Sequence, residues 1–325
     1  MSCYVTKSTL LVCSKSAITY DLVNTNLTVN GNIMIKLKSL QSLVTSAVVA
    51  STLSISVLGS VNLYAHSDHK HSTVSLEQAV AGEHRSAKNK ARDQYRHPVE
   101  TLAFFGFTPE MTVVEITPGG GWYTEILAPA LKGKGKLYGA HYPDTGEDNY
   151  YSNSRKKLVA MLASNPIYSE VVLTDFVPRQ PSELAPEGTA DLVLTFRNLH
   201  NWKDEGVEQV FKDAFKALKA GGVLGVVEHR LPAGVAPEKA KGYVSEANTI
   251  KQAKAAGFRF AGASEVNANP KDMAEHPKGV WTLPPSLALG ETDKEKYLAI
   301  GESDRMTLKF VKPENSSFSD FKKQK

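Results

Sequence analysis

The stretch Thr112-Val-Val-Glu-Ile116 runs directly into Thr117-Pro-Gly-Gly-Gly121, and this junction decides the fold. Four of the first five residues are β-branched, which is typical of a strand, and the glycines that follow break it. Apolar residues then return with helical spacing between Trp122 and Leu131. Strand, glycine turn and helix in this order predict the first unit of an α/β sheet whose strands run parallel.

The same alternation of strand and helix continues towards the C-terminus. Short β-rich runs predict six more strands, over residues 136–140, 170–175, 190–196, 223–227, 258–263 and 306–311. Helical spacing predicts helices over residues 155–162, 206–220 and 245–256, after one or two lead-in helices between residues 86 and 106. We interpret Gly221-Gly222 as the stop of the helix over 206–220. Crossover helices imply a mainly parallel sheet covered on both faces, with ligands at the carboxyl ends of its strands.

Composition excludes several classes of function. The chain has 325 residues, and 38 Lys+Arg against 34 Asp+Glu give a net charge of +4. Residues 1–65 hold four Lys and one Asp, so three of those four charges belong to this segment and the remainder is nearly neutral. We therefore expect no nucleic-acid partner. Both cysteines, Cys3 and Cys13, also lie before residue 66, which excludes a disulfide, a thiolate nucleophile and Cys-ligated zinc in the rest of the chain.

The segment before residue 66 has the pattern of a leader. Met34-Ile-Lys-Leu-Lys38 is positive, residues 39–64 carry no charge, and Ala65 is a small residue where a signal peptidase would cut. We interpret residues 34–65 as a signal peptide, so the mature chain would begin at residue 66 and be exported, to the periplasm. The alternative is an uncleaved membrane anchor. Residues 1–33 precede a better start and suggest an over-extended reading frame or disorder.

The remaining chain divides into three parts. Residues 66–85 are expected to form a mobile tail, 86–313 the main domain with a lid or insertion over 267–303, and 314–325 a C-terminal tail. Three histidines of the first tail could ligate copper or zinc, but a solvated, mobile tail is the favoured interpretation: His66, His69 and His71. We assign no metal site to the main domain, and the sequence does not indicate an oligomeric state.

The junction resembles the first motif of class I S-adenosylmethionine-dependent methyltransferases, in which an acid precedes glycines at alternate positions. Glu115, Gly119 and Gly121 match this motif, and Thr117 stands where its first glycine usually is. The likeness extends from about Ser86 to Lys312. It implies a Rossmann-like seven-stranded sheet with an antiparallel C-terminal edge strand. A nicotinamide-binding Rossmann domain would explain the glycines but not this ending.

The amino-acid sequences of other segments resemble those of an exported, uncharacterised methyltransferase-like family. These segments are Arg96-His97-Pro98, Trp122 and the insertion around His276-Pro-Lys-Gly-Val-Trp281. The resemblance implies S-adenosyl-L-methionine as cofactor and a small-molecule substrate of unknown identity.

The resemblance also implies roles for residues near the cofactor. Glu115 would meet the amino group of its methionine portion, and Thr117 to Gly121, including Gly120, would line its backbone. The family usually has an acid for the ribose hydroxyls at the end of the second strand, where this chain has His141. Asp144 is the substitute candidate, with a solvated turn acid as the alternative. Asp175 would lie near the adenine, or else cap a turn.

Polar residues at the fourth and fifth strand ends are candidates for the acceptor side. His200 and His229 could take a proton from the acceptor, because imidazole titrates near neutral pH; a loop hydrogen bond is the alternative for His200. Arg197 could orient an anionic substrate or pair with Glu228. The remaining substrate-binding candidates are Glu228, Arg230, Trp281 and Arg305.

We therefore expect a methyltransferase that acts on an unidentified small molecule. Export raises a second hypothesis, because S-adenosylmethionine is made in the cytoplasm. In that hypothesis the chain is a catalytically inactive exported binding protein on the same fold, consistent with the altered motif positions Thr117 and His141.

Overall fold

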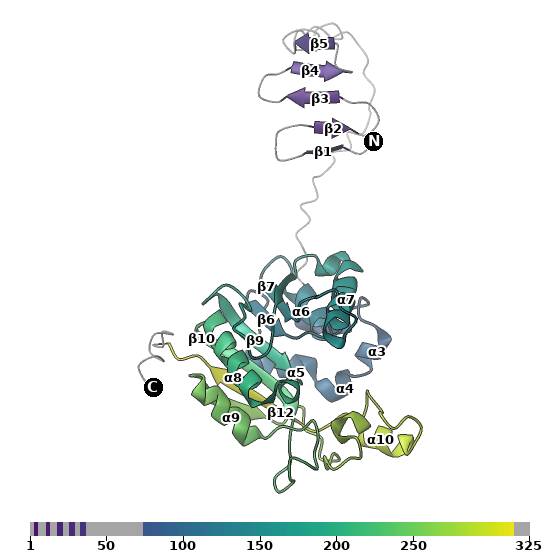
Figure 1. Cartoon of the computed structure of the whole chain (residues 1–325), viewed down its shortest axis with the longest axis vertical. Helices are drawn as coiled ribbons and strands as arrows, with labels where there is room; N and C mark the ends of the chain where they lie inside the picture. The colour runs from purple at the N-terminus through teal and green to yellow at the C-terminus, as the bar shows by residue number, and fades with distance from the viewer. Residues whose placement is uncertain are drawn as a thin grey trace, which may run out of the picture. The chain divides into compact units, whose positions relative to one another are not determined.

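The computed structural model describes residues 74–314 and, by backbone alone, five short strands between residues 3 and 36. The chain divides into two units, residues 1–68 and 69–325. The first unit contains antiparallel strands, drawn in purple in Figure 1: β1 (Cys3–Val5) with β2 (Leu11–Cys13), and β3 (Ile18–Asp21), β4 (Asn26–Val29) and β5 (Ile33–Lys36) as a three-stranded sheet.

Of the predicted signal peptide over residues 34–65, the structure describes only the first residues. The positive segment that begins at Met34 lies partly in β5, and the uncharged run over 39–64 lies outside the described residues. The three tail histidines, His66, His69 and His71, also lie outside them. The signal peptide, the start site and export stay predictions. Among the described residues, no helix combines the length and the apolar character that a membrane span requires.

The second unit is built on a seven-stranded sheet. Its strands are β6 (Thr112–Ile116), β7 (Lys136–His141), β8 (Val172–Asp175), β9 (Ala190–Phe196), β10 (Leu218–His229), β11 (Arg259–Ser264) and β12 (Arg305–Val311), in the order β11-β12-β10-β9-β6-β7-β8. Strands β6 to β10 pair in parallel, and β12 pairs antiparallel with both β10 and β11. The predicted α/β fold is confirmed, and the C-terminal strand enters next to the edge strand β11.

Helices cover both faces of this sheet (Figure 1). The α-helices of this unit are α2 (Leu76–Ala81), α3 (Ala87–Lys90), α4 (Asp93–Arg96), α5 (Pro98–Phe105), α6 (Thr124–Leu131), α7 (Tyr150–Ala163), α8 (Leu199–Ala217), α9 (Glu246–Ala255) and α10 (Lys294–Ile300), of which α10 belongs to the insertion before β12. Because neighbouring residues of a strand point to opposite faces, Val113 packs in a core with α2, α5 and α6, and Val114 in a second core with α8 and α9. Two apolar cores therefore hold the sheet between two layers.

Several boundaries differ from the prediction, among them the following three. Helix α8 begins at Leu199 instead of residue 206, because the Glu228 carboxylate accepts hydrogen bonds from its first amides. The helix ends at Ala217, and Leu218 already pairs with Ala190, so Gly221-Gly222 lies inside β10 and does not stop the helix. Part of the tail expected over 66–85 is helix α2, which buries Ala79.

The insertion between β11 and β12 is attached to the domain at several points. It contains α10 and the short helix η2 (Gly279–Thr282). Asn267 Nδ2 donates hydrogen bonds to Thr101 Oγ1 (3.0 Å) and Thr307 Oγ1 (2.9 Å). Buried Asp272 accepts from the Tyr243 hydroxyl (2.8 Å) and bonds His276 Nε2 (2.7 Å). The segment is therefore fixed by buried polar contacts at both of these places.

Candidate functional site

A cavity of about 660 Å³ lies at the carboxyl edge of the sheet. Residues that follow β7, β6 and β9 line it, as do His229 at the end of β10 and Arg305 at the start of β12. His229 and Arg305 are direct partners in the antiparallel pair, so both lie at this edge. Strand β6 has β7 on one side and β9 on the other, which makes this the switch point where open α/β sheets bind ligands.

The glycine loop after β6 borders the cavity. A side chain added at Gly119 or Gly120 would enter open space, whereas one at Gly121 would meet the Met161 side chain at 2.1 Å. Gly119 and Gly120 line the cavity, and Gly121 does not. Gly121 packs against α7 and has a left-handed φ of +84°, which favours glycine, and the two glycines before it leave room for a ligand.

Thr117 adopts the backbone conformation that glycine would favour at its position. Its φ is +53°, which is an outlier for a β-branched residue. Its backbone N–H donates to Ala140 O at 2.7 Å, and its buried Oγ1 makes no well-formed hydrogen bond. The departure from the motif therefore changes the side chain and keeps the shape of the loop.

Glu115 lies behind this loop and is 3% exposed. Burial raises the pKa of Glu115 to about 7, and the hydrogen bond from Thr124 Oγ1 (2.6 Å) opposes that rise only in part. Glu115 is not among the residues that line the cavity. The structure thus gives this carboxyl a contact with α6.

The three polar residues expected beyond the second and third strands do not line the cavity. His141 is fully buried, with Nε2 at 3.1 Å from Ser154 Oγ, and burial lowers its pKa. Asp144 accepts from the Gly146 amide in a turn. The Asp175 side chain is 68% exposed and lies 3.4 Å from Arg155. The turn-acid alternative describes Asp144, and all three cofactor roles stay predictions.

Three tyrosines near the end of β7 line the cavity. Tyr142 follows β7 directly, and Tyr150 and Tyr151 begin α7. All three line the cavity, and the Tyr142 and Tyr151 rings lie 4.5 Å apart. Trp202 Nε1 donates to the Tyr142 hydroxyl (2.9 Å) and fixes it. None of these rings was predicted as a site residue, although Tyr142 comes two residues after the predicted strand end at Ala140.

Glu228 positions His200. Its fully buried Oε1 lies 3.0 Å from His200 Nδ1, and its Oε2 accepts from the Leu199 amide at 2.7 Å. Because a carboxylate only accepts, His200 Nδ1 carries the proton and Nε2 of the neutral ring is an acceptor. His200 lines the cavity, so the pair presents a base of defined tautomer to a ligand.

His229 lies beside His200 and also lines the cavity. The two ring centroids are 5.2 Å apart, and His229 Nδ1 shares a hydrogen bond with Ser303 Oγ. Burial, and then the charge of His200 and nearby arginines, lower the pKa of His229 well below its usual value. We therefore expect His229 to be a neutral hydrogen-bonding group at neutral pH.

The substrate-binding candidates divide into two groups. Arg197, Trp281 and Arg305 line the cavity, and the Trp281 ring centroid is 5.9 Å from that of His200. Arg230 instead forms ion pairs with Asp304 (2.8 Å) and Glu265 (2.6 Å) outside the lining. No ion pair joins Arg197 to Glu228 among the described residues.

Two further arginines also line the cavity, although neither was predicted as a site residue. Arg92 and Arg96 come from the lead-in segment around α4, more than a hundred residues before Arg197. Trp122 also lines the cavity, and the Arg96 guanidinium lies 4.5 Å from its ring centroid. Neither residue lies at the end of a strand, and the predicted site residues were chosen mainly from strand ends.

His200, Glu228 and His229 also meet the spacing of a metal site. Each offers one ligand atom, and these atoms lie within 4.8 Å of one another. Both Glu228 oxygens already accept hydrogen bonds, however, and four arginines line the same cavity. Because these positive charges repel a cation, we assign no metal to this site.

No protein-family model matches the sequence. No curated protein matches it either. Solved structures are similar to it at low identity. They include a SAM-dependent methyltransferase from Aquifex aeolicus (15% identity, 68% of this chain and 93% of that one, TM-score 0.47). A second is an S-adenosylmethionine-dependent methyltransferase from Mesorhizobium loti (13%, 66% and 96%, 0.43). A third is fibrillarin from Aeropyrum pernix with natively bound S-adenosyl-L-methionine (12%, 67% and 76%, 0.42). Identities this low do not carry over an activity, so the function is argued from the cavity's own residues.

Proposed function

We propose that this protein binds S-adenosyl-L-methionine and transfers its methyl group to a small-molecule acceptor. The observation that carries the proposal is the cavity at the switch point of the sheet, which joins an open glycine loop to a base of fixed tautomer. Gly119 and Gly120 lie on one part of its lining and His200 on another. A donor and an acceptor bound in one cavity gain the proximity that methyl transfer requires.

The residues of the glycine side fit the cofactor in three respects. Gly119 and Gly120 leave space for close approach of a ligand to the backbone. Thr117 Oγ1 is a buried hydroxyl that a polar ligand atom could bond. Tyr150 and Tyr151 offer aromatic faces on which an adenine ring can stack. At the ribose position the chain differs from the family's pattern, because buried His141 stands there, so a hydroxyl such as that of Tyr142, which follows β7 and lines the cavity, would have to serve.

The bound cofactor supplies an activated methyl group: the acceptor's lone pair forms the new bond, the S–C bond breaks, and its electron pair stays on sulfur. Within this protein, His200 Nε2 takes the proton that a hydroxyl or amine acceptor loses. Glu228 keeps Nε2 free to accept and stabilises the positive charge that the ring gains. His229 and Arg197 contribute orientation.

Calorimetric titration of the full chain with S-adenosylmethionine and S-adenosylhomocysteine tests the proposal. Gly120→Leu should weaken cofactor binding by at least about tenfold, and Gly120→Ala less, because these side chains enter the cavity. Ala163→Leu adds the same leucine on the exposed surface of α7 and should bind as the unmodified chain does. Absence of binding at millimolar cofactor, or equal losses in both leucine variants, would remove the proposal and leave the inactive binder.

We also propose that the protein is exported. The order of positive segment, uncharged run and Ala65 supports this location. Sequencing the N-terminus of the mature protein tests it, with residue 66 expected first. A first residue before Ala50 would contradict a cleaved signal peptide.

A further inference from the structure

Four arginine side chains from distant parts of the sequence line the same cavity. We call Arg92, Arg96, Arg197 and Arg305 the arginine cluster. Arg92 and Arg96 flank the lead-in helix α4, Arg197 follows β9, and Arg305 begins β12. All four line the cavity. Side chains from three distant parts of the chain thus present like charges to one space.

A single carboxylate neutralises this cluster. Glu302 forms ion pairs with Arg92, Arg96 and Arg305, and its side chain is 1% exposed. Burial alone would raise the pKa of Glu302, but the charges of Arg305, Arg96 and Arg92 outweigh burial and lower it to about 2. Glu302 is therefore ionised, and three positive charges remain without a counter-charge from it.

The lining offers no other counter-charge. Among the described residues, no aspartate or glutamate lines the cavity. Glu228 forms no ion pair with the cluster in the part of the chain that the structure describes, and its charge opposes the lowering of the Arg197 pKa only in part. Burial and the neighbouring charges lower the pKa of Arg96 well below its usual value, and burial with the charge of Arg305 lowers that of Arg197 to about 10. Without a bound anion, the guanidinium charges of the cluster therefore repel one another.

Donor atoms of the cluster are also unpaired. Arg92 Nη2, Arg96 Nη2 and Arg305 Nε are buried without a hydrogen bond in the described part of the chain. Arg96 and Arg305 are 3% and 2% exposed, so water does not compensate them freely. The Arg197 side chain makes no hydrogen bond or ion pair among the described residues. Buried guanidinium donors of this kind match carboxylate and phosphate oxygens.

The cluster is held in place before a ligand arrives. The Arg96 guanidinium lies over the Trp122 ring, and Arg305 Nη1 donates to Tyr95 O at 2.7 Å. Trp122 Nε1 in turn donates to Asn89 O at 3.0 Å. A ligand therefore loses little side-chain entropy when it binds here, which favours tight recognition.

We propose that the arginine cluster binds a small oxyanion with at least two negative charges, either a di- or tricarboxylate or a phosphate group. If the proposed function holds, this anion is the methyl acceptor, held beside His200. Four arginines against Glu302 and the more distant Glu228 leave an excess of two positive charges, so a monocarboxylate would leave the cluster only partly neutralised.

Calorimetry on the cofactor-free full chain at constant ionic strength tests this. Inorganic phosphate and citrate are the probes, acetate is the monoanion and glycerol the neutral control. We expect saturable one-to-one binding of a probe and at least about tenfold weaker binding of acetate. Equal affinities for citrate, phosphate and acetate would overturn the proposal, because screening alone would then explain them. Stronger binding of phosphate or of citrate identifies which oxyanion chemistry the site prefers.

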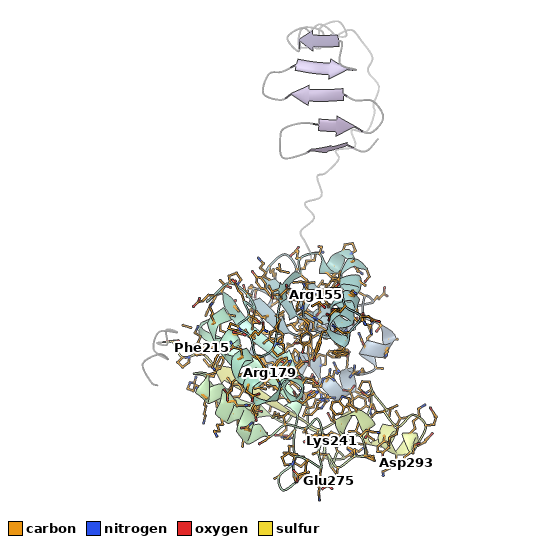
Figure 2. The ribbon with its side chains drawn as sticks, in the orientation of Figure 1. Arg155, Arg179, Phe215, Lys241, Glu275 and Asp293 are labelled. Carbon is orange, nitrogen blue, oxygen red and sulfur yellow. The ribbon has the colours of Figure 1, made fainter. Side chains whose placement is uncertain are left out.

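A matched pair of arginine variants locates the site. Arg197 (φ +59°) and Arg179 (φ +69°) both have left-handed backbone, and Arg179, labelled in Figure 2, is exposed and outside the lining. Arg197→Gln breaks no ion pair and should weaken probe binding at least about tenfold. Arg179→Gln should leave it unchanged. Equal effects of the two variants would contradict the assignment.

Repeating the titration with saturating S-adenosylmethionine separates the two proposals. If the anion binds and the cofactor never does, the arginine cluster assignment stands and methyl transfer fails. If the cofactor binds and displaces the anion one for one, the cluster holds the methionine carboxylate, and the assignment of a second ligand is overturned. Simultaneous binding of both supports both.

Discussion

Thr124 Oγ1 donates a 2.6 Å hydrogen bond to Glu115 Oε2, and no other hydrogen bond reaches that carboxyl in the described part of the chain. The acid of the glycine motif is thus tied to the first residue of α6. Its burial raises its pKa to about 7. Glu115 is therefore partly protonated near neutral pH, which makes the stability of the domain sensitive to pH in a defined direction.

Glu115→Gln should remove a pH-dependent loss of stability. An acid whose pKa is higher in the folded chain than its ordinary 4.5 favours folding at low pH, and this advantage disappears as the pH rises from 4.5 to about 7. Relative to the variant, the unmodified chain should lose up to about 3 kcal/mol across that window. Urea denaturation at several pH values without cofactor measures this, and parallel pH curves for the two proteins would contradict the raised pKa.

Thr117→Gly should stabilise the protein. The left-handed φ of +53° strains a β-branched residue by about 1–2 kcal/mol, and the flexibility of glycine in the unfolded chain returns roughly half of that. We expect a net gain of up to about 1 kcal/mol in thermal or urea unfolding. Thr117→Ala retains the strain and serves as the control. A loss of stability in the glycine variant would mean that the threonine side chain holds the loop.

Glu228 should act on catalysis through His200. In two-bond ¹⁵N–¹H spectra, His200 should show the tautomer protonated at Nδ1, and Glu228→Gln should lose this preference, because an amide can donate as well as accept. An Nε2-protonated ring in the unmodified chain would contradict this geometry.

His200→Asn should keep cofactor affinity within about twofold and lower transfer to an identified acceptor by about 10²–10⁴.

Metal removal should have no effect. His200, Glu228 and His229 lie close enough to ligate an ion, but the arginine cluster surrounds them with positive charge. We expect elemental analysis of the purified full chain to find well under one equivalent of transition metal, and EDTA to leave cofactor and anion affinities unchanged. A stoichiometric metal that EDTA removes together with ligand binding would reverse our assignment.

Much of the fold could be predicted because its signals are local. Strand β9 has the bounds that the apolar run from Ala190 to Phe196 predicted, and Ser245 caps α9 as expected of a helix start there. The interpretation of Gly221-Gly222 was wrong because Leu218 pairs with Ala190 across the sheet, a contact that no local pattern contains. The early start of α8 depends on Glu228, which is also distant in sequence.

The site was predictable only where strand ends carry it. His200, His229 and Arg197 follow or end strands, and the cavity brings them together. His141 also ends a strand, but its ring is buried against Ser154, which register alone could not reveal. Arg92 was not predicted as a site residue, because it comes from a helical segment whose packing depends on Glu302, more than two hundred residues later.

The attachment of the insertion by Asn267 and Asp272 has a kinetic consequence. A segment bonded to Thr101, Thr307 and Tyr243 does not swing away as a hinged lid would. We expect ligand exchange to proceed by rotation of the exposed rings of the cavity, Tyr150, Tyr151 and Trp281, which are 77%, 51% and 42% exposed. Side-chain rotations take picoseconds to nanoseconds, so entry into this cavity should be limited by diffusion and desolvation and not by a slow opening step.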